Sequence, residues 1–331
     1  MNIEKMKQCI KAAYHARQPV MIWGAPGVGK SAGCSQAAAE EGVGFIDLRL
    51  PLLEPVDLRG LPSIDKGVAK WSRPDFLPTS GKGILMLDEI VQAVPSMQAA
   101  ASQLVLDRRI GNYTLPDGWS VVAAGNRLSD RAATNAMPTH IANRFVHLYA
   151  EVSLDTWVQW ALKAKIDIRE IAFLKWRTPL LHAFDAQAKA HAFPSPRSWE
   201  FVNKILATKL PHDLLLEMVK GAVGEGAAAE FIGFLRVFET MVDPDTILLN
   251  PSSAMLPADP AGRYAVVTAL ACRATKDNLH KIVTYCNRFT DEAGAPEYSI
   301  AAIKAVVARD DKLSTTKAFI EWASKHNFLM V

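Results

Sequence analysis

The chain has 331 residues, of which 50% are hydrophobic and 21% are charged. At about 150 residues per domain this length predicts two folded units, and the apolar content excludes disorder as the main state. Lys and Arg number 37 against 34 Asp and Glu, which gives a formal net charge of +3. A charge this small gives no support for nucleic-acid binding by bulk electrostatics.

The cysteine pattern and the absence of long apolar runs indicate the cellular compartment in which the protein is expected. Cys9, Cys34, Cys272 and Cys286 form no Cys-x-x-Cys pair, and no histidine cluster has metal-ligand spacing. We therefore expect free thiols in a reducing compartment. No apolar run approaches the ~20 residues that span a bilayer, and residues 1–19 form an amphipathic pattern rather than a signal peptide. These features predict a cytoplasmic protein with no membrane partner.

The hydrophobic pattern of the first 150 residues alternates between helices and short apolar strands. A helix is predicted over 3–16, where Pro19 follows its end, and further helices are predicted over 31–41 and 94–106. The predicted strands are 20–23, 45–50, 84–87, 121–124 and 145–149. Such alternation predicts an α/β sandwich with a mostly parallel five-stranded sheet.

Strand patterns stop after residue 150, and the remaining chain has helical periodicity. Four prolines between residues 243 and 262 indicate a linker or irregular segment there. Helices are again expected around 263–289 and 299–327. The predicted organisation is an α/β core over 1–150, a helical unit over 151–242, a linker over 243–262 and a helical extension over 263–331.

The strongest motif is GAPGVGKS at residues 24–31, which matches G-x-x-x-x-G-K-[ST] between a predicted strand and a predicted helix. Its glycines let the backbone N–H groups point at phosphate oxygens, and the following helix adds its positive dipole end. Lys30 is expected to reach the β- and γ-phosphates, and the Ser31 hydroxyl to ligate Mg²⁺. A chance glycine turn is the alternative, which the flanking elements disfavour. The predicted nucleotide-binding residues are Gly24, Ala25, Pro26, Gly27, Val28, Gly29, Lys30, Ser31 and Asp88.

Polar side chains follow two of the predicted strands. Asp88 and Glu89 end the strand over 84–87, and Asn126 follows the strand over 121–124. Ligands of open α/β sheets bind off the carboxyl ends of the strands. We expect Asp88 to hold the metal with Ser31, Glu89 to orient or deprotonate the attacking water, and Asn126 to contact the γ-phosphate or that water. A solvated acidic pair and an ordinary Gly-Asn turn are the alternatives.

Six blocks of the sequence resemble the MoxR-like group of AAA+ ATPases, in that family's order, between about residues 15 and 205. They are GAPGVGKS at 24–31, EPVDLRGLP at 54–62, LMLDEI at 85–90, VVAAGNRLSDRA at 121–132, MPTHIANRF at 137–145 and FPSPRSWEF at 193–201. The resemblance implies an ATPase that forms a ring of identical subunits, expected to be a hexamer. It also implies that ATP and Mg²⁺ lie between the α/β core and a helical lid, at the interface between subunits.

The same resemblance implies roles for individual residues. Asn126 corresponds to the sensor that aligns the attacking water, and Arg144 to the arginine finger that a neighbouring subunit receives. Arg131 is a second arginine able to face that interface, ranked below Arg144. Arg197 corresponds to the second sensor, on the lid, with Ser195 as a plausible helix cap. A surface ion pair is the alternative for Arg144, and a solvated cap arginine for Arg197.

Three functions are compatible with these features. The first is an ATP-driven motor or chaperone that remodels or assembles a partner protein. In the MoxR-like group that partner is often a protein with a von Willebrand factor A domain, and an insertion corresponding to residues 56–76 faces it. A nucleic-acid motor or loader is the second, disfavoured by the near-neutral charge. The third is a nucleotide-gated scaffold, disfavoured by the complete set of Lys30, Asp88, Glu89, Asn126 and Arg144.

Overall fold

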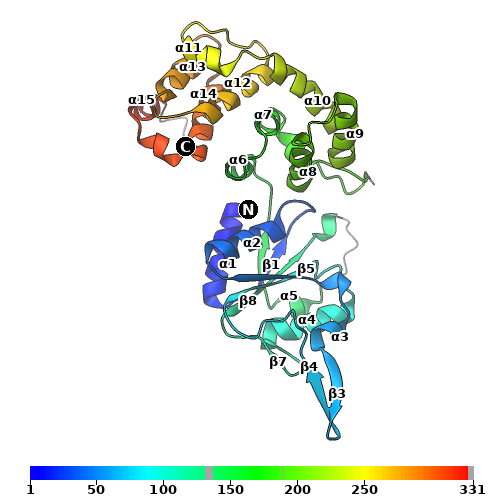
Figure 1. Ribbon diagram of the computed structural model, residues 1–331. Helices are drawn as coiled ribbons and strands as arrows, with labels where there is room; N and C mark the ends of the chain where they lie inside the picture. Colours follow the sequence, from blue (N-terminus) through cyan, green and yellow to red (C-terminus); the bar gives the residue numbers. More distant parts are fainter. Residues whose placement is uncertain (131–136, 189, 327–331) are drawn as a thin grey trace. The chain divides into compact units, whose positions relative to one another are not determined.

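A computed structural model describes residues 1–130, 137–188 and 190–326. The chain divides into two compact units. The first contains Met1–Ser153 together with Phe184–Lys189, and the second contains Leu154–Ala183 and Ala190–Val331. Among the described residues, every strand belongs to the first unit, and the second is built from helices (Figure 1).

The first unit is organised around a five-stranded sheet in which all neighbouring strands are parallel. The strand order is β2-β5-β8-β1-β9. Val20 at the start of β1 pairs with Val122 of β8 on one side and with Val146 of β9 on the other. The parallel sheet predicted from the sequence is therefore confirmed. The strands are β1 (Val20–Trp23), β2 (Gly44–Arg49), β5 (Gly83–Asp88), β8 (Trp119–Gly125) and β9 (Val146–Tyr149).

Helices cover both faces of this sheet, because successive strand residues point to opposite faces. Ile22 and Met86 belong to a core shared with α1 and α2, whereas Met21 and Leu87 belong to a core shared with α4. Figure 1 shows α1 and α2 on one side of the sheet and α3, α4 and α5 on the other. The helices of this unit are α1 (Ile3–Ala16), α2 (Lys30–Glu40), α3 (Pro55–Arg59), α4 (Pro95–Asp107) and α5 (Thr139–Ala142), with the 3-10 turns η1 (Leu50–Leu52) and η2 (Leu128–Asp130).

Close packing fixes α2, the helix that follows the glycine-rich loop, against α1. A Cβ at Gly33 would lie 2.4 Å from the Met6 Cε, so a larger residue there would force the Met6 side chain to move. The nearly buried Lys7 of α1 pairs with Glu40 of α2 at 2.6 Å. The position of α2 is thus set by both apolar and ionic contacts.

Two hairpins interrupt the alternation of strands and helices. Between β2 and β5, the antiparallel strands β3 (Leu61–Asp65) and β4 (Val68–Ser72) form a hairpin that projects from the sheet (Figure 1). Before β8, β6 (Arg109–Ile110) and β7 (Tyr113–Thr114) form a shorter one. It turns at Gly111 and Asn112, where Gly111 has a φ of 55°.

The second unit corrects the expected boundaries at residues 243–262 and 263–331. A helix, α11, occupies part of the predicted linker, because Asp243 caps it and Pro244 suits its first turn. Helix α12 is buried on nearly all sides and packs against α7 and α10 as well as α13 and α14. An all-round apolar helix belongs inside a core, so the C-terminal helices are not a separate extension. The helices are α6 (Leu154–Lys163), α7 (Ile168–Trp176), α8 (Pro196–Leu206), α9 (His212–Val223), α10 (Glu225–Thr240), α11 (Pro244–Leu249), α12 (Pro260–Arg273), α13 (Leu279–Asp291), α14 (Pro296–Arg309) and α15 (Lys317–Lys325), with the 3-10 turns η3 (Thr178–Leu181) and η4 (Asp311–Thr315).

The architecture of the first unit is that of an α/β P-loop NTPase. Its glycine-rich loop joins the carboxyl end of β1 to the amino end of α2, and β1 lies between β8 and β9 in the parallel sheet. The all-helical second unit follows it in the chain, as predicted. In the part of the chain that the structure describes, no helix has the length and apolar character needed to cross a bilayer.

Candidate nucleotide-binding site

At two positions of the loop between β1 and α2, the backbone has a conformation that only glycine adopts without strain. Gly27 and Gly29 have φ values of 78° and 97°. A Cβ at Gly24 would lie 2.9 Å from the Ala150 carbonyl oxygen, so this position also excludes a side chain. Gly29 is the N-cap of α2 and provides no side-chain hydrogen bond to the first turn. The N-terminus of a helix attracts anions, and Gly29 places no side chain over this one.

Lys30 links this loop to the end of β8. Its Nζ donates to the Gly24 and Ala25 carbonyl oxygens at 2.7 and 3.2 Å and to the Asn126 Oδ1 at 2.9 Å. Asn126 follows Gly125, the last residue of β8, and is 9% exposed. Two residues that lie 96 positions apart in the sequence therefore meet at the carboxyl edge of the sheet.

A second contact joins α2 to β5. The Ser31 hydroxyl donates to the Asp88 Oδ2 at 2.8 Å, while the Asp88 Oδ1 accepts from the Glu89 backbone N–H at 2.9 Å. Hydroxyl and carboxylate oxygens are hard donors of the kind that Mg²⁺ prefers. Among the described residues, no group of three or more His, Cys, Asp and Glu side chains is arranged to hold a metal. Ser31 and Asp88 therefore fit Mg²⁺ only as part of a shell completed by nucleotide oxygens and water.

Glu89 directly follows β5 and has a φ of 58°, in the left-handed region. This conformation costs a non-glycine residue roughly 1 kcal/mol or more, and such strain often occurs at functional sites. The turn it creates is closed by the Gln92 N–H, which donates to the Glu89 carbonyl oxygen at 2.8 Å.

Asp47, which we did not predict, adds negative charge near this edge. Burial raises the pKa of Asp47, and the carboxylates of Asp88 and Glu89 add to that rise while Arg49 opposes it. Arg49 ends β2 and pairs in register with Asp88. The available sequence signal was the alternation of polar with apolar residues in β2, which places Asp47 and Arg49 on the same strand face. The part of this pKa rise that Asp88 and Glu89 cause reflects negative charge that a bound cation would offset.

Arg144 is not near its own glycine-rich loop. It lies just before β9, whose first residue Val146 is paired with Val20 at the amino end of β1. The loop leaves from the opposite, carboxyl end of β1, roughly 10 Å further along a strand of this length. The Arg144 guanidinium donates to the Ser102 carbonyl oxygen of α4 at 3.4 Å. The alternative of a surface ion pair is not realised for Arg144 among the described residues.

A contact that we did not predict connects β1 with the Arg144 segment. The Trp23 indole N–H donates to the His147 Nδ1 at 2.8 Å, and the two rings stack with an interplanar angle of 13°. The His147 Nε2 lies 2.9 Å from the Ala142 carbonyl oxygen. Since Nδ1 accepts, Nε2 must carry the proton and donate. Trp23 directly precedes the loop, and Ala142 ends α5 two residues before Arg144.

The remaining predicted residues lie elsewhere. Arg197 is exposed in the first turn of α8, in the second unit, where Ser195 caps the helix through a capping box with Ser198. The expected cap at Ser195 is thus confirmed. Arg131 falls outside the described residues. The structure therefore brings together Lys30, Ser31, Asp88 and Asn126, with Glu89 adjacent.

Comparisons with known proteins give distant similarities. No protein-family model matches the chain. Midasin from Giardia intestinalis is 27% identical over 164 residues, which are 46% of this chain and only 3% of midasin. NtrX from Brucella abortus is 13% identical with a TM-score of 0.43, over 94% of this chain and 67% of NtrX. RuvB from Thermotoga maritima is 15% identical with a TM-score of 0.41, over 91% of this chain and 86% of RuvB. The fold is accordingly assigned from the strand order and the loop of the chain itself.

Proposed function

We propose that this protein is a Mg²⁺-dependent ATPase that works as a ring of identical subunits, of the MoxR-like AAA+ type, and remodels or assembles a partner protein. The observation that carries the ATPase proposal is the meeting of two contacts at one edge of the sheet. These are Lys30 with Asn126 at 2.9 Å and Ser31 with Asp88 at 2.8 Å. They bring α2, β5 and β8 to the loop that is built to receive phosphate.

The loop and its lysine would bind the phosphate chain of ATP. The N–H groups from Gly27 to Ser31 would supply donors, and the positive φ angles of Gly27 and Gly29 give the loop the shape that turns these groups inward. Lys30 already lies against the loop carbonyls, so its charge is held where the β- and γ-phosphates bind. Mg²⁺, when bound, neutralises charge on the phosphate oxygens. Ser31 and Asp88 would hold it, directly or through water.

Glu89 and Asn126 would act on the attacking water. Glu89 lies in a strained turn directly after Asp88, and we propose that its carboxylate faces the phosphate site and is not a metal ligand. We assign it the role of orienting the water and accepting its proton. Asn126, held by Lys30, would hydrogen-bond the same water or the γ-phosphate from the neighbouring strand.

The position of Arg144 supports a ring. Because it lies at the amino edge of the sheet and its guanidinium contacts the Ser102 carbonyl oxygen of α4, we propose that it serves the site of the next subunit and not its own. A guanidinium that reaches the transferring phosphate in this way is worth ~10³-fold or more in rate. Arg197 would contribute from the helical unit as the second sensor. The ring is proposed to be a hexamer on the basis of the family resemblance.

The β3–β4 hairpin supports a protein as the partner. Its apolar side chains are exposed, with exposed fractions of 84% for Ile64, 68% for Leu61 and 61% for Val68. Lys70 and Asp65 pair across its strands at 2.5 Å, which leaves Lys66 in the turn as the exposed cation of the hairpin, a small charge for binding a phosphate backbone. We propose that it contacts the partner, and that a protein with a von Willebrand factor A domain is the first candidate.

Purified wild-type protein and a Glu89→Gln variant test the proposal. The wild type should hydrolyse ATP in the presence of Mg²⁺, whereas Glu89→Gln should bind Mg·ATP with similar affinity and lose turnover. Partner proteins that are retained by the ATP-bound Glu89→Gln form but not by Lys30→Ala would identify the substrate. Normal turnover by Glu89→Gln would contradict the role of Glu89. Salt-sensitive stimulation by DNA, with no protein retained, would replace the protein-remodelling proposal with a nucleic-acid motor.

A further inference from the structure

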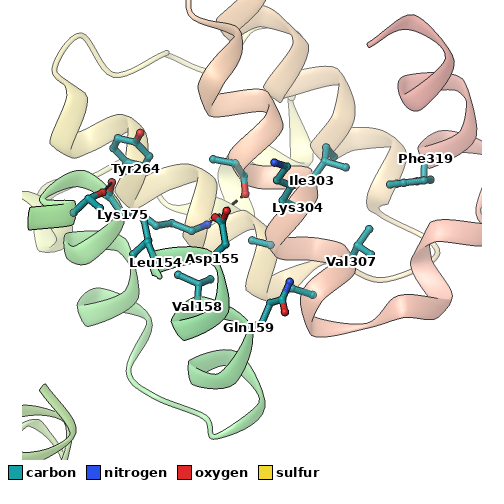
Figure 2. Close-up of a pocket in the computed structure, with 14 residues that line it drawn as sticks. Leu154, Asp155, Val158, Gln159, Lys175, Tyr264, Ile303, Lys304, Val307 and Phe319 are labelled. Carbon is teal, nitrogen blue, oxygen red and sulfur yellow. Dashed lines mark hydrogen bonds between the residues drawn. The ribbon is translucent and has the colours of Figure 1, made fainter. Parts of the chain in front are cut away.

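The second unit contains a pocket that is unrelated to the nucleotide site. It measures about 510 Å³ and is formed mainly by α6 and α14, with single residues from α7, η3, α12 and α15 (Figure 2). That volume falls within the roughly 300–1,000 Å³ that small-molecule sites occupy. Its walls are largely apolar and include Val158 of α6, Ile303 and Val307 of α14 and Phe319 of α15.

Lys175, near the end of α7, introduces a cation into this apolar space. Figure 2 shows its side chain reaching toward Asp155 of α6. Its Nζ donates to the Ala301 carbonyl oxygen at 3.3 Å, a long hydrogen bond. Among the described residues Lys175 forms no ion pair. Its ammonium group has three N–H donors, so donors beyond the one that bonds Ala301 can bind a ligand in the pocket.

The surroundings of Lys175 penalise its charge. Burial lowers the pKa of Lys175 to about 8, although Cys272 and Asp155 favour the charged form. An apolar side chain at this position would avoid that cost. An anion placed against the amine would offset the same cost, since an opposite charge within a few ångströms favours the charged form.

The other charged groups of the pocket limit which anion fits. Lys304 of α14 lies at the exposed rim, and Asp155 is the acidic residue among the lining side chains. Two lysines and one aspartate leave a single net positive charge, which matches a monoanion. A phosphate dianion would be repelled by Asp155 more strongly than a monoanion and would gain nothing from the apolar walls.

We propose that this pocket binds a small amphipathic carboxylate. The carboxylate accepts hydrogen bonds from Lys175, and the apolar body lies along Val158, Ile303 and Val307. Binding here is a second ligand-binding property of the chain, separate from nucleotide binding, because none of the lining residues is among those assigned to the nucleotide site.

Calorimetric titration of the full chain with decanoate and with decanol tests the proposal. These probes share an apolar chain and differ in charge. Wild-type protein should bind decanoate more tightly than decanol. Lys175→Met should weaken decanoate binding by roughly 10- to 100-fold, as expected for loss of a charged hydrogen bond, and leave decanol unchanged. Lys163→Met, an exposed lysine on α6 outside the pocket, is the matched control and should bind both probes as the wild type does. Equal decanoate binding by Lys175→Met and wild type, or no decanoate binding by wild type, would overturn the proposal.

A second measurement uses only wild-type protein, so it does not depend on the folding of a variant. Wild-type protein is treated briefly with acetic anhydride near pH 8 with and without decanoate, and acetylation is measured at each lysine by mass spectrometry. Decanoate should protect Lys175 and leave Lys163 as reactive as before. Protection of neither lysine, or equal protection of both, would overturn the proposal.

Discussion

Ser31 on α2 donates a hydrogen bond to Asp88 at the end of β5, with the hydroxyl and carboxylate oxygens 2.8 Å apart. The contact joins the first turn of the phosphate-loop helix to the neighbouring buried strand. The Ser31 and Asp88 oxygens of this contact are the two that we propose hold Mg²⁺. The proposed metal site is therefore partly assembled by contacts within the chain.

Removing the Ser31 hydroxyl should weaken metal-dependent ATP binding without unfolding the protein. We expect Ser31→Ala to raise the Mg²⁺ concentration that gives half-maximal ATP binding by roughly tenfold or more. A fluorescent ATP analogue titrated at several Mg²⁺ concentrations measures this. Ser35→Ala, an exposed serine one turn along the same helix, should behave as the wild type. An unchanged Mg²⁺ requirement in Ser31→Ala would exclude Ser31 as a metal-binding residue.

Substitutions of Lys30 and Asn126 should affect different steps, although the two side chains contact each other: the first should weaken ATP binding and the second should slow ATP turnover. Lys30→Met removes the charge held at the loop and should lose most of the ATP affinity. Asn126→Ala leaves that charge in place and should lower kcat by about 10²-fold with a small change in affinity. Steady-state kinetics with direct binding measurements make the distinction. Equal loss of affinity in both variants would mean that Asn126 acts only by positioning Lys30.

The first unit could be predicted well from the sequence because its signals are local. Short apolar runs mark the buried parallel strands, and Gly24, Lys30 and Ser31 lie within one motif between a strand and a helix. Asp88 and Asn126 could be added because parallel strands end at the same edge of the sheet. The expected linker over 243–262 was wrong in part. Pro244 and Pro260 lie in the first turns of helices, and a sequence pattern does not distinguish such prolines from prolines in loops. The expectation that residues 263–331 form a separate extension was also wrong. Helix α12 is buried by α7 and α10, which are distant in the sequence, and a local pattern does not reveal such contacts.

The contact between Trp23 and His147 shows what the sequence could not indicate. The two residues are 124 positions apart, and neither belongs to a motif. Only the pairing of β1 with β9 brings their rings together. Asp47 was missed for the same reason, since its proximity to Asp88 follows from the pairing of β2 with β5.

The Trp23–His147 contact should contribute measurably to stability. We expect His147→Phe, which keeps an aromatic ring but leaves the indole N–H without its acceptor, to lower the free energy of unfolding by about 1 kcal/mol. Denaturant unfolding of His147→Phe, Trp23→Phe and the double variant gives the coupling between them. Strict additivity of the two single effects would show that the hydrogen bond contributes nothing.

Glu170 on α7 should make the protein less stable as pH rises. It is fully buried, and both carboxylate oxygens lack hydrogen-bond partners among the described residues. Burial, with smaller contributions from Asp167 and Glu200, raises the pKa of Glu170 well above its usual 4.5. The folded state therefore binds the proton more tightly, and its advantage is greatest below about pH 4.5 and is lost as pH rises through the folded-state pKa.

Glu170→Met should accordingly stabilise the protein at neutral pH by about 1–3 kcal/mol, with a smaller gain at acidic pH. Denaturant unfolding at several pH values measures the difference. Glu217→Gln, an exposed glutamate on α9, should stay within about 0.5 kcal/mol of the wild type throughout. A neutral-pH loss of stability in Glu170→Met would show that the carboxyl group has a favourable partner.

The central claim is that each active site combines Glu89 of one subunit with Arg144 of the next. Mixing purified Glu89→Gln and Arg144→Ala subunits, each inactive alone, tests it directly. An Arg144→Ala subunit keeps its own Glu89 and can receive an intact finger from a Glu89→Gln neighbour. We predict that ATP turnover reappears on mixing and reaches a maximum at intermediate ratios. Turnover that never exceeds the sum of the two parent proteins would contradict it.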